Sequence, residues 1–273
     1  MDTTTALAAR QAPLEYWFLK LNTPELAFLA DLIIRPAGAE VRLSVWVDGH
    51  GRVIRGSGTP DVSTAGARVG DSVLGTSAST GTSGCVSWDL RYEIGPVWVD
   101  PGRMVRALRP FDMELVSAPG TRFTGRIVVD GRAYAVDATP GLIAHYWGKR
   151  LPRRWYWLSV NTPSLDIDVV VSHARLWSLP GPAIRAGYLY LDDRERRRSI
   201  VSPLNGLVRA SGQPGGAVIV SAWAPAGNVR LRCAAPPAAF NDLGEGIRQT
   251  LIGDCEIGGQ RISGVAGIET RNE

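Results

Sequence analysis

A nine-residue pattern occurs twice in this chain and constrains its fold more than any other feature. Residues 16–24 (YWFLKLNTP) and 155–163 (WYWLSVNTP) both read as three aromatics, a leucine, a polar residue, an aliphatic residue and Asn-Thr-Pro. The copies start 139 residues apart in a chain of 273. Solenoid repeats have periods of roughly 20–50 residues, so this spacing is too long for one. The duplication predicts two related halves, each a complete sheet or barrel.

Local patterns in both halves are those of β-strands joined by tight turns. Residues 86–94 alternate apolar and polar side chains with a period of two, as a half-buried strand does. Residues 41–49 and 126–131 each end in Asp-Gly, a hairpin-type turn. The chain holds 31 Gly and 18 Pro, which argue against a coiled coil or a helical repeat. We therefore predict an all-β protein.

The repeat places the boundary between the halves near the middle of the chain. We predict an N-terminal barrel over residues 1–150 and a shorter C-terminal barrel over residues 151–273. Residues 56–84 are rich in Gly, Ser and Thr, which predicts a long loop or an insertion. Helical periodicity is nearly absent, and the best helical segment is short, at residues 239–247.

Composition and charge argue against several classes of protein. There is no run of roughly 20 apolar residues for a transmembrane helix, and the N-terminal segment lacks the apolar stretch of a secretory signal. We expect a cytoplasmic protein without stable membrane insertion. Three scattered cysteines are too few for a disulfide scaffold or a zinc site. The net charge of +4 comes from short basic clusters without a nucleic-acid-binding motif, so nucleic acid is not an expected partner.

Cofactor motifs are also missing from the sequence. It contains no glycine-rich dinucleotide or phosphate loop, no HExxH and no GxSxG. The three histidines lie far apart, which argues against a metal centre. We expect a protein that uses no nucleotide, flavin or metal.

Aromatic side chains are concentrated where the two halves meet, in residues 141–161. Alternate residues of a strand share a face, so the second copy of the pattern presents two indoles, a hydroxyl and an amide on one side. Small-molecule sites are usually apolar pockets with a few polar groups. The alternative is that these aromatics only fill the barrels. The predicted substrate-binding residues are Tyr16, Phe18, Lys20, Asn22, Trp88, Trp147, Trp155, Trp157 and Asn161.

Three residues are candidates for acid–base catalysis. His145 shares a strand face with Trp147 and is equally consistent with a buried structural role. Asp112 and Glu114 alternate with apolar residues and would share a face of one strand. Two close carboxylates raise the pKa of one of them, which allows it to donate a proton near neutral pH. The alternative is a strand with one solvated face.

The junction resembles the lipocalin-like superfamily that includes tocopherol cyclases, carotenoid 1,2-hydratases and natural-product Diels–Alderases. The resemblance implies two tandem lipocalin-like antiparallel β-barrels with a ligand cavity. It also implies a large apolar substrate, such as a polyene, a prenyl chain or a polyketide, often without a cofactor. The residues that carry it, together with the duplicated strand, are Gly141, His145, Trp147, Gly148, Pro152, Trp155, Trp157 and Asn161.

On this basis we expect a cofactor-independent cyclase of natural-product or antibiotic biosynthesis that cyclizes a hydrophobic polyene or polyketide. A pericyclic reaction of the Diels–Alder type is slightly favoured over a proton-initiated one, because no carboxylate lies within the matched motif. Two alternatives stay open. One is a carotenoid-type hydratase or an acid-promoted prenyl cyclase, and the other is a lipocalin-like protein that only binds a hydrophobic ligand.

Overall fold

The computed structural model describes residues 2–95, 98–101, 113–174, 184–225 and 227–272. Strands dominate the described part, whose helices are one five-residue α-helix and one short 3-10 helix. The prediction of an all-β protein is confirmed. None of the described helices is long and apolar enough to cross a bilayer. Contacts divide the chain into two compact units: Met1–Asp48, Arg52–Gly102 and Met113–Leu151 form unit 1, and Pro152–Glu273 forms most of unit 2.

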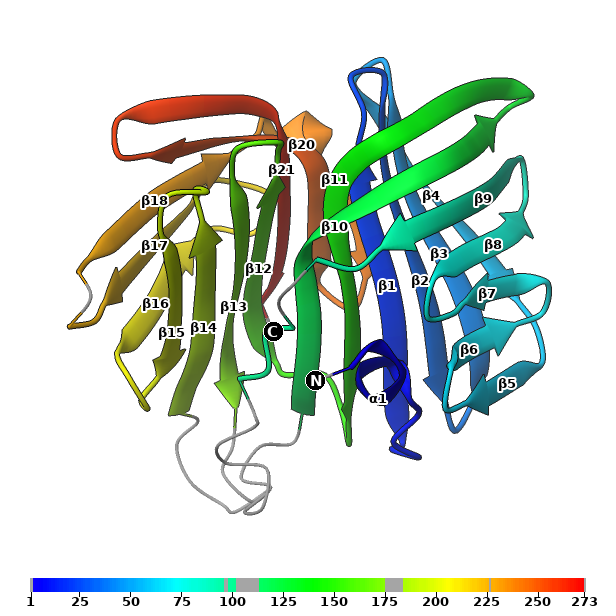
Figure 1. Cartoon of the computed structure of the whole chain (residues 1–273), viewed down its shortest axis with the longest axis horizontal. Coiled ribbons are helices and arrows are strands. Elements are labelled where there is room, and N and C mark those ends of the chain that lie inside the picture. The colour runs from blue at the N-terminus through cyan, green and yellow to red at the C-terminus, as the bar shows by residue number, and fades with distance from the viewer. Residues whose placement is uncertain (1, 96–97, 102–112, 175–183, 226, 273) are drawn as a thin grey trace. The chain divides into compact units, whose positions relative to one another are not determined.

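Unit 1 is a curved, open antiparallel sheet, a half-barrel (Figure 1). Its elements are α1 (Thr3–Leu7), β1 (Leu14–Asn22), β2 (Leu26–Arg35), β3 (Gly38–Val47), β4 (His50–Ser57), β5 (Pro60–Ser63), β6 (Gly66–Val69), β7 (Ser72–Leu74), β8 (Ala78–Ser83), β9 (Val86–Glu93), β10 (Met113–Val129) and β11 (Arg132–Gly148). The strand order is β4-β3-β2-β1-β11-β10-β9-β8-β7-β6-β5. The curvature brings β6 against β2 and β3.

Unit 2 repeats this plan and is a nearly closed barrel. Its elements are β12 (Arg154–Asn161), β13 (Asp166–Ala174), β14 (Ile184–Asp192), β15 (Arg197–Ser202), β16 (Leu207–Gly212), β17 (Val218–Trp223), β18 (Val229–Ala234), η2 (Pro237–Ala239), β19 (Asn241–Gly244), β20 (Ile247–Ile257) and β21 (Gln260–Asn272). The order is β15-β14-β13-β12-β21-β20-β18-β17-β16, and β19 pairs with β20. The end strand β16 lies against β14 and β15, which nearly closes the barrel.

The duplicated pattern occupies the same place in both sheets. It forms β1, between β2 and β11, and β12, between β13 and β21. The turn after each copy is also the same. The Thr23 hydroxyl accepts from the Leu26 backbone N–H at 3.0 Å, and the Thr162 hydroxyl accepts from the Leu165 N–H at 3.0 Å. The matching strand order around each copy and the matching turns show that the two units share one fold plan.

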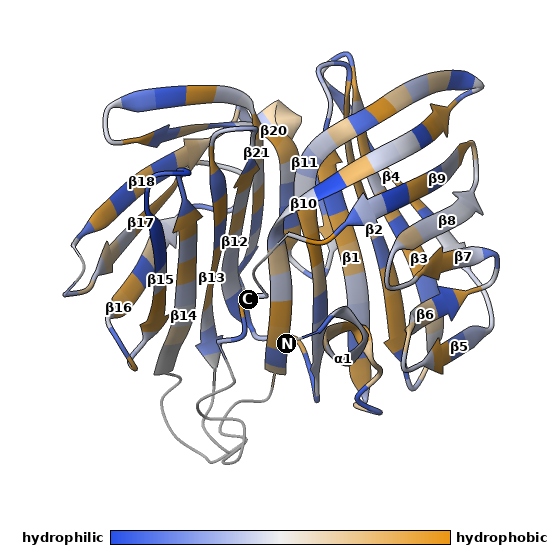
Figure 2. Ribbon diagram, viewed as in Figure 1, coloured by the Kyte–Doolittle hydropathy of each residue, from blue (hydrophilic) through white to orange (hydrophobic). Residues whose placement is uncertain are grey.

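Each sheet encloses its own apolar core, built by alternate residues of its strands. Trp17, Leu19 and Leu21 of β1 belong to the core of unit 1, whereas Leu158 and Val160 of β12 belong to the core of unit 2. Figure 2 shows the resulting alternation of apolar and polar residues along the strands. The side chains between these core positions therefore lie on the outer face of each sheet.

Two predictions about local structure are wrong. Residues 239–247 are not helical but form the end of η2, the short strand β19 and the start of β20. Glu245 and the glycines that flank it have φ angles of +52°, +79° and +70°, so the chain turns there instead of coiling. Residues 56–84 complete β4 and form strands β5 to β8 rather than a long loop, and Ala67, Val69 and Leu74 of this segment are buried in the core of unit 1.

Candidate functional site

The outer face of unit 1 carries four of the predicted substrate-binding residues. Phe18 and Lys20 of β1 are buried, with Lys20 fully inaccessible to solvent, and Tyr16 and Asn22 are half-buried. Tyr16 stacks on Tyr146 of β11 with ring centroids 4.8 Å apart. The antiparallel register, which pairs Tyr16 with Tyr146, places these side chains on one face.

A buried ion pair lies on the same face. Asp31 of β2 is directly opposite Phe18, and Arg42 of β3 is opposite Asp31. The Arg42 guanidinium donates through Nε at 2.7 Å and lies 2.6 Å from the carboxylate through Nη2. Burial raises the pKa of Asp31 because it disfavours the charged form, and the nearby Arg42 only partly offsets this effect. Sequence reasoning missed this pair, although both residues interrupt apolar strands.

The outer face of unit 2 carries the indoles of the second copy. Trp155 and Trp157 are buried, with 6% and 5% of their surface exposed. The Trp155 Nε1 donates to Glu269 of β21 at 2.8 Å, and Gln249 of β20 donates to the other oxygen of that carboxylate at 2.6 Å. Arg271 lies over the Trp155 ring at 5.3 Å. A carboxylate is thus held directly beside the predicted indoles.

Polar side chains continue along β12 toward its end. The Ser159 hydroxyl donates to the Asn161 side-chain carbonyl at 2.8 Å, and the Asn161 amide donates to Asp166 of β13 at 3.1 Å. Arg194 completes the chain through a 2.8 Å contact with Asp166. Ser159, Asn161 and Asp166 are all buried. Asn161, predicted to bind substrate, therefore orients this network.

A second buried carboxylate flanks β12 on the side away from Glu269. Asp168 of β13 is directly opposite Ser159 and accepts a short hydrogen bond from the hydroxyl of Tyr188 on β14. Asp168 is fully buried, and Tyr188 is 2% exposed. Asp168 and Glu269 belong to the two neighbours of β12 and share its outer face, two strand spacings apart across the sheet and two residues apart along it, or roughly 12 Å. The alternation of acidic and apolar residues at the start of β13 was the available sequence signal for Asp168.

His145 lies on the other face of its sheet, toward the core of unit 1. It is fully buried and stacks on Trp17 with ring centroids 4.4 Å apart. Its Nδ1 donates to the Ala6 carbonyl at 3.0 Å, and its Nε2 lies 3.1 Å from Oε2 of Glu15. Since the carbonyl can only accept, Nδ1 carries a proton, and the contact with Glu15 requires one more. The ring therefore ties α1 to the sheet.

The His145–Glu15 pair has a distinct electrostatic setting. Burial lowers the pKa of His145, against the opposing effect of its bonds to Glu15 and the Ala6 carbonyl. Burial also opposes ionisation of Glu15, but the hydrogen bonds from His145 and from the backbone N–H groups of Arg10 and Ala12 outweigh it and lower the pKa of Glu15. The structure thus gives this histidine a structural setting, one of the two roles that the sequence left open.

Of the remaining predicted residues, those that the structure describes do not lie on either outer face. Trp147 and Glu114 are paired across β11 and β10 on the same side as His145. Trp88 belongs to the core of unit 1, where its Nε1 donates to the Ser79 hydroxyl at 2.9 Å. Asp112 lies outside the described residues.

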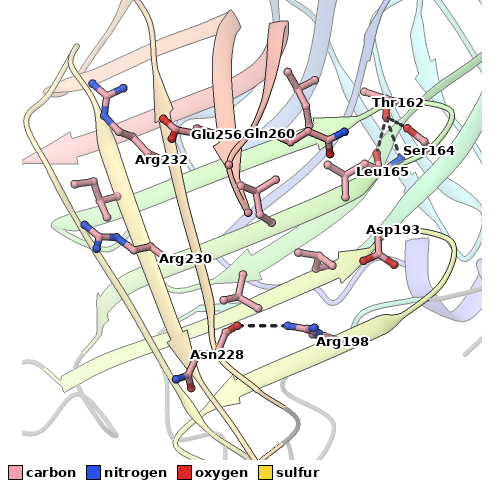
Figure 3. Close-up of a pocket in the computed structure, with 17 residues that line it drawn as sticks. Thr162, Ser164, Leu165, Asp193, Arg198, Asn228, Arg230, Arg232, Glu256 and Gln260 are labelled. Carbon is pink, nitrogen blue, oxygen red and sulfur yellow. Dashed lines mark hydrogen bonds between the residues drawn. The ribbon is translucent and has the colours of Figure 1, made fainter.

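Unit 2 also contains a separate cavity of about 1000 Å³ at the end of its barrel where β12 turns into β13 (Figure 3). Its lining includes none of the predicted site residues. Among the described residues, no group of three or more His, Cys, Asp or Glu side chains is arranged to hold a metal ion.

Comparison with known proteins supports the fold. Two solved structures resemble the chain, each with a TM-score of 0.65: kievitone hydratase from Nectria haematococca, and a Nitrosomonas europaea protein provisionally assigned as an AttH. The hydratase is 13% identical, and the match covers all of this chain and 93% of that one. The second is 12% identical, with 96% of this chain and 93% of that one covered. The chain has a lipocalin-like barrel fold, which at least one enzyme shares.

Sequence comparison matches a smaller part of the chain. No known family profile matches the chain. Over 96 residues, 34% of the chain, it is 29% identical to the uncharacterized proteins Rv0493c and MT0513 from two strains of Mycobacterium tuberculosis. The match spans only 29% of the length of those relatives.

Proposed function

We propose that this protein is an enzyme that protonates a carbon–carbon double bond of an apolar small molecule, after which an oxygen nucleophile captures the cation. The observation that carries the proposal is the buried Asp168–Tyr188 pair, in register with Ser159 and beside Trp157 on the outer face of unit 2. Acid–base catalysis needs a positioned carboxyl group, and indole faces stabilise neighbouring positive charge.

The roles follow from the geometry of β12 and its two neighbours. The Asp168 carboxyl group, oriented by Tyr188, transfers a proton to one alkene carbon, and the cation forms at the other carbon near Trp157. Water, or a hydroxyl of the same substrate, then bonds to the cation and releases its proton to a carboxylate. Glu269, held by Trp155 and Gln249, is the second carboxylate on this face. The net change is addition of water, or ring closure to an isomer, without oxidation or reduction.

This proposal changes which of the reactions left open by the sequence we favour. The pericyclic route was favoured because no carboxylate lies within the duplicated motif. The antiparallel register brings Asp168 and Glu269 beside it from the neighbouring strands. Kievitone hydratase, which has the same fold, is by its name a hydratase. We therefore favour hydration, with proton-initiated cyclization as the second outcome of the same chemistry.

The test is isotopic. The full-length protein is incubated with a panel of prenylated phenols and acyclic polyenes in water labelled with ¹⁸O and deuterium, and products are analysed by mass spectrometry. Hydration places both labels in the product, and proton-initiated cyclization places only deuterium on carbon. A cyclized product without either label would overturn the proposal in favour of shape-driven pericyclic catalysis. Recovery of every ligand unchanged, with saturable binding, would overturn it in favour of a binding protein.

Tyr188→Phe removes the hydroxyl that donates to Asp168 and tests the pair directly. We expect turnover to fall and its pH profile to shift, because the carboxylate loses a hydrogen-bond donor. Tyr156→Phe is the matched control, since that hydroxyl bonds the Gly212 carbonyl on the core side of β12. Equal turnover in both variants would contradict the assigned role.

A further inference from the structure

The cavity of unit 2 has a mixed lining at the ends of barrel strands, in which six apolar side chains lie among nine polar or charged residues and two glycines. Leu165, Leu191 and Val229 are core residues that line it, together with the partly buried Ile257. Its volume of about 1000 Å³ is at the upper end of the range for small-molecule sites. The cavity is therefore large enough for a ligand with a long apolar portion.

One charged side chain of the lining projects from the inner face of the barrel. Arg198 of β15 is directly opposite Leu191, and two residues later Ile200 is opposite Leu189. Leu189, Leu191 and Ile200 all belong to the core. Directly opposite residues of an antiparallel pair share a face, so Arg198 occupies an inward position at the mouth. It is half-buried, and its Nη1 donates to the Asn228 carbonyl at 3.4 Å (Figure 3).

The other charged side chains that line the cavity are placed differently from Arg198. Arg230 and Arg232 alternate with the core residues Val229 and Leu231 on β18, and Figure 3 shows their side chains on the far side of that strand. Asp193 is engaged in its own turn, where its carboxylate accepts the backbone N–H groups of residues 195 and 196 at 3.2 and 2.6 Å. Glu256 of β20 is directly opposite Arg232 in the strand register, so the two share the outer face.

We propose that this cavity binds an apolar molecule that ends in a carboxylate, with the carboxylate on Arg198 and the chain against the apolar wall. A guanidinium offers several donors in a planar fork that matches a carboxylate, and charge-assisted hydrogen bonds are about twice as strong as neutral ones. The site is separate from the outer face of β12 and does not depend on the reaction proposed for it.

The experiment titrates the full-length protein calorimetrically with dodecanoate and with dodecanol, its uncharged counterpart, below their aggregation concentrations. We expect dodecanoate to bind with a Kd well below about 1 mM. We expect dodecanol, and dodecanoate with Arg198→Gln, to bind at least about tenfold more weakly, since hydrogen bonds to charged groups contribute that much. Arg198→Lys keeps the positive charge but loses the planar guanidinium group. Its affinity for dodecanoate should therefore lie between those of the wild type and Arg198→Gln.

Arg230→Gln is the matched control, because it removes the same charge from the outer side of β18. This variant should bind dodecanoate like the wild type. The proposal is overturned if dodecanoate does not bind, if dodecanol binds equally well, or if Arg230→Gln weakens binding as much as Arg198→Gln. Circular dichroism of each variant establishes that the barrel is intact. Because binding is measured without turnover, failure here leaves the proposed reaction untouched.

Discussion

The two copies of the duplicated strand have matching neighbours and matching turns, but their sheets carry different chemistry on the outer faces. Strand order, register and the Asn-Thr-Pro turn agree between unit 1 and unit 2. At register-equivalent positions, however, unit 2 has carboxylates where unit 1 has small or aliphatic residues. These pairs are Ala27 and Asp166, Leu29 and Asp168, and Ala144 and Glu269.

Reverse exchanges also occur, and one of them shows how unit 1 uses its face. Asp31, which is buried on the outer face of unit 1, has Val170 as its equivalent in unit 2. Asp31 is neutralised by Arg42, whereas Asp168 is bonded by the hydroxyl of Tyr188. A guanidinium favours the ionised form of a carboxylate more strongly than a neutral hydroxyl does. The comparison teaches that one scaffold holds a buried carboxylate beside a cation in one copy and beside a hydroxyl group in the other.

The largest expected effect is on turnover, and it distinguishes Asp168 from Asp31. Asp168→Asn should lower turnover by about 10²–10⁴-fold, the usual contribution of a general acid or base. Asp31→Asn should leave turnover close to that of the wild type, because its carboxylate serves the ion pair. Steady-state rates on a substrate found by the isotopic screen provide the measurement. Loss of activity in Asp31→Asn with retained activity in Asp168→Asn would reverse the assignment.

Substitutions on the core sides of the two repeated strands should also differ in how much they lower the free energy of unfolding. Trp17 is fully buried, stacks on His145 and donates to the Leu7 carbonyl at 2.8 Å, so Trp17→Ala should cost about 3–5 kcal/mol. Its equivalent Tyr156 is half-buried, and Tyr156→Ala should cost about 1 kcal/mol. Urea unfolding followed by circular dichroism compares the two. Equal losses of unfolding free energy would show that the contact of Trp17 with α1 adds nothing to stability.

The buried ion pair of unit 1 predicts a pH-dependent loss of stability. Arg42→Met leaves Asp31 buried without its partner and should cost about 3–5 kcal/mol at neutral pH. Arg42 lowers the pKa of Asp31 against the larger effect of burial, so its removal raises that pKa further, and the folded variant takes up a proton before the unfolded chain does as the pH falls. The penalty should therefore shrink as the pH falls toward about 4.

The exposed pair of Arg55 and Glu40 is the control for that experiment. Arg55→Met should cost less than about 1 kcal/mol at either pH, since solvent screens this ion pair. Unfolding free energies at neutral and acidic pH test both variants together. A penalty for Arg42→Met that grew on acidification would contradict the predicted direction.

The smallest expected effect should be the same in both copies. Thr23→Val and Thr162→Val each remove one hydroxyl that accepts a backbone N–H in the repeated turn. Each should cost about 1 kcal/mol, the typical contribution of one hydrogen bond. Unfolding midpoints of the two variants are compared directly. A clear difference between them would mean that the turns, although alike in geometry, differ in their surroundings.

Much of the fold could be read from short stretches of sequence. The duplicated motif predicted two related all-β units, and alternation along β1 and β12 predicted which side chains share a face. These features depend on local backbone geometry, in which alternate residues of a strand always point the same way. The same reasoning failed at residues 56–84 and 239–247, where strand pairing decided the conformation of a weakly patterned segment.

The candidate site was predictable only along the motif itself. Trp155, Trp157 and Asn161 were found because they lie in one continuous strand. Asp168, Tyr188 and Glu269 come from three other strands, and only the antiparallel register brings them to the same face.

His145 shows the same division between sequence and tertiary structure. The sequence left both a pocket role and a buried structural role open for it. Its ring nitrogens contact Ala6 and Glu15, which lie 139 and 130 positions earlier in the sequence. Only folding of the sheet brings these residues near His145. The sequence by itself therefore determined the strands and their repeat, because these follow from local periodicity. Only the tertiary structure decided which polar groups meet, because strand register sets neighbours that are distant along the chain.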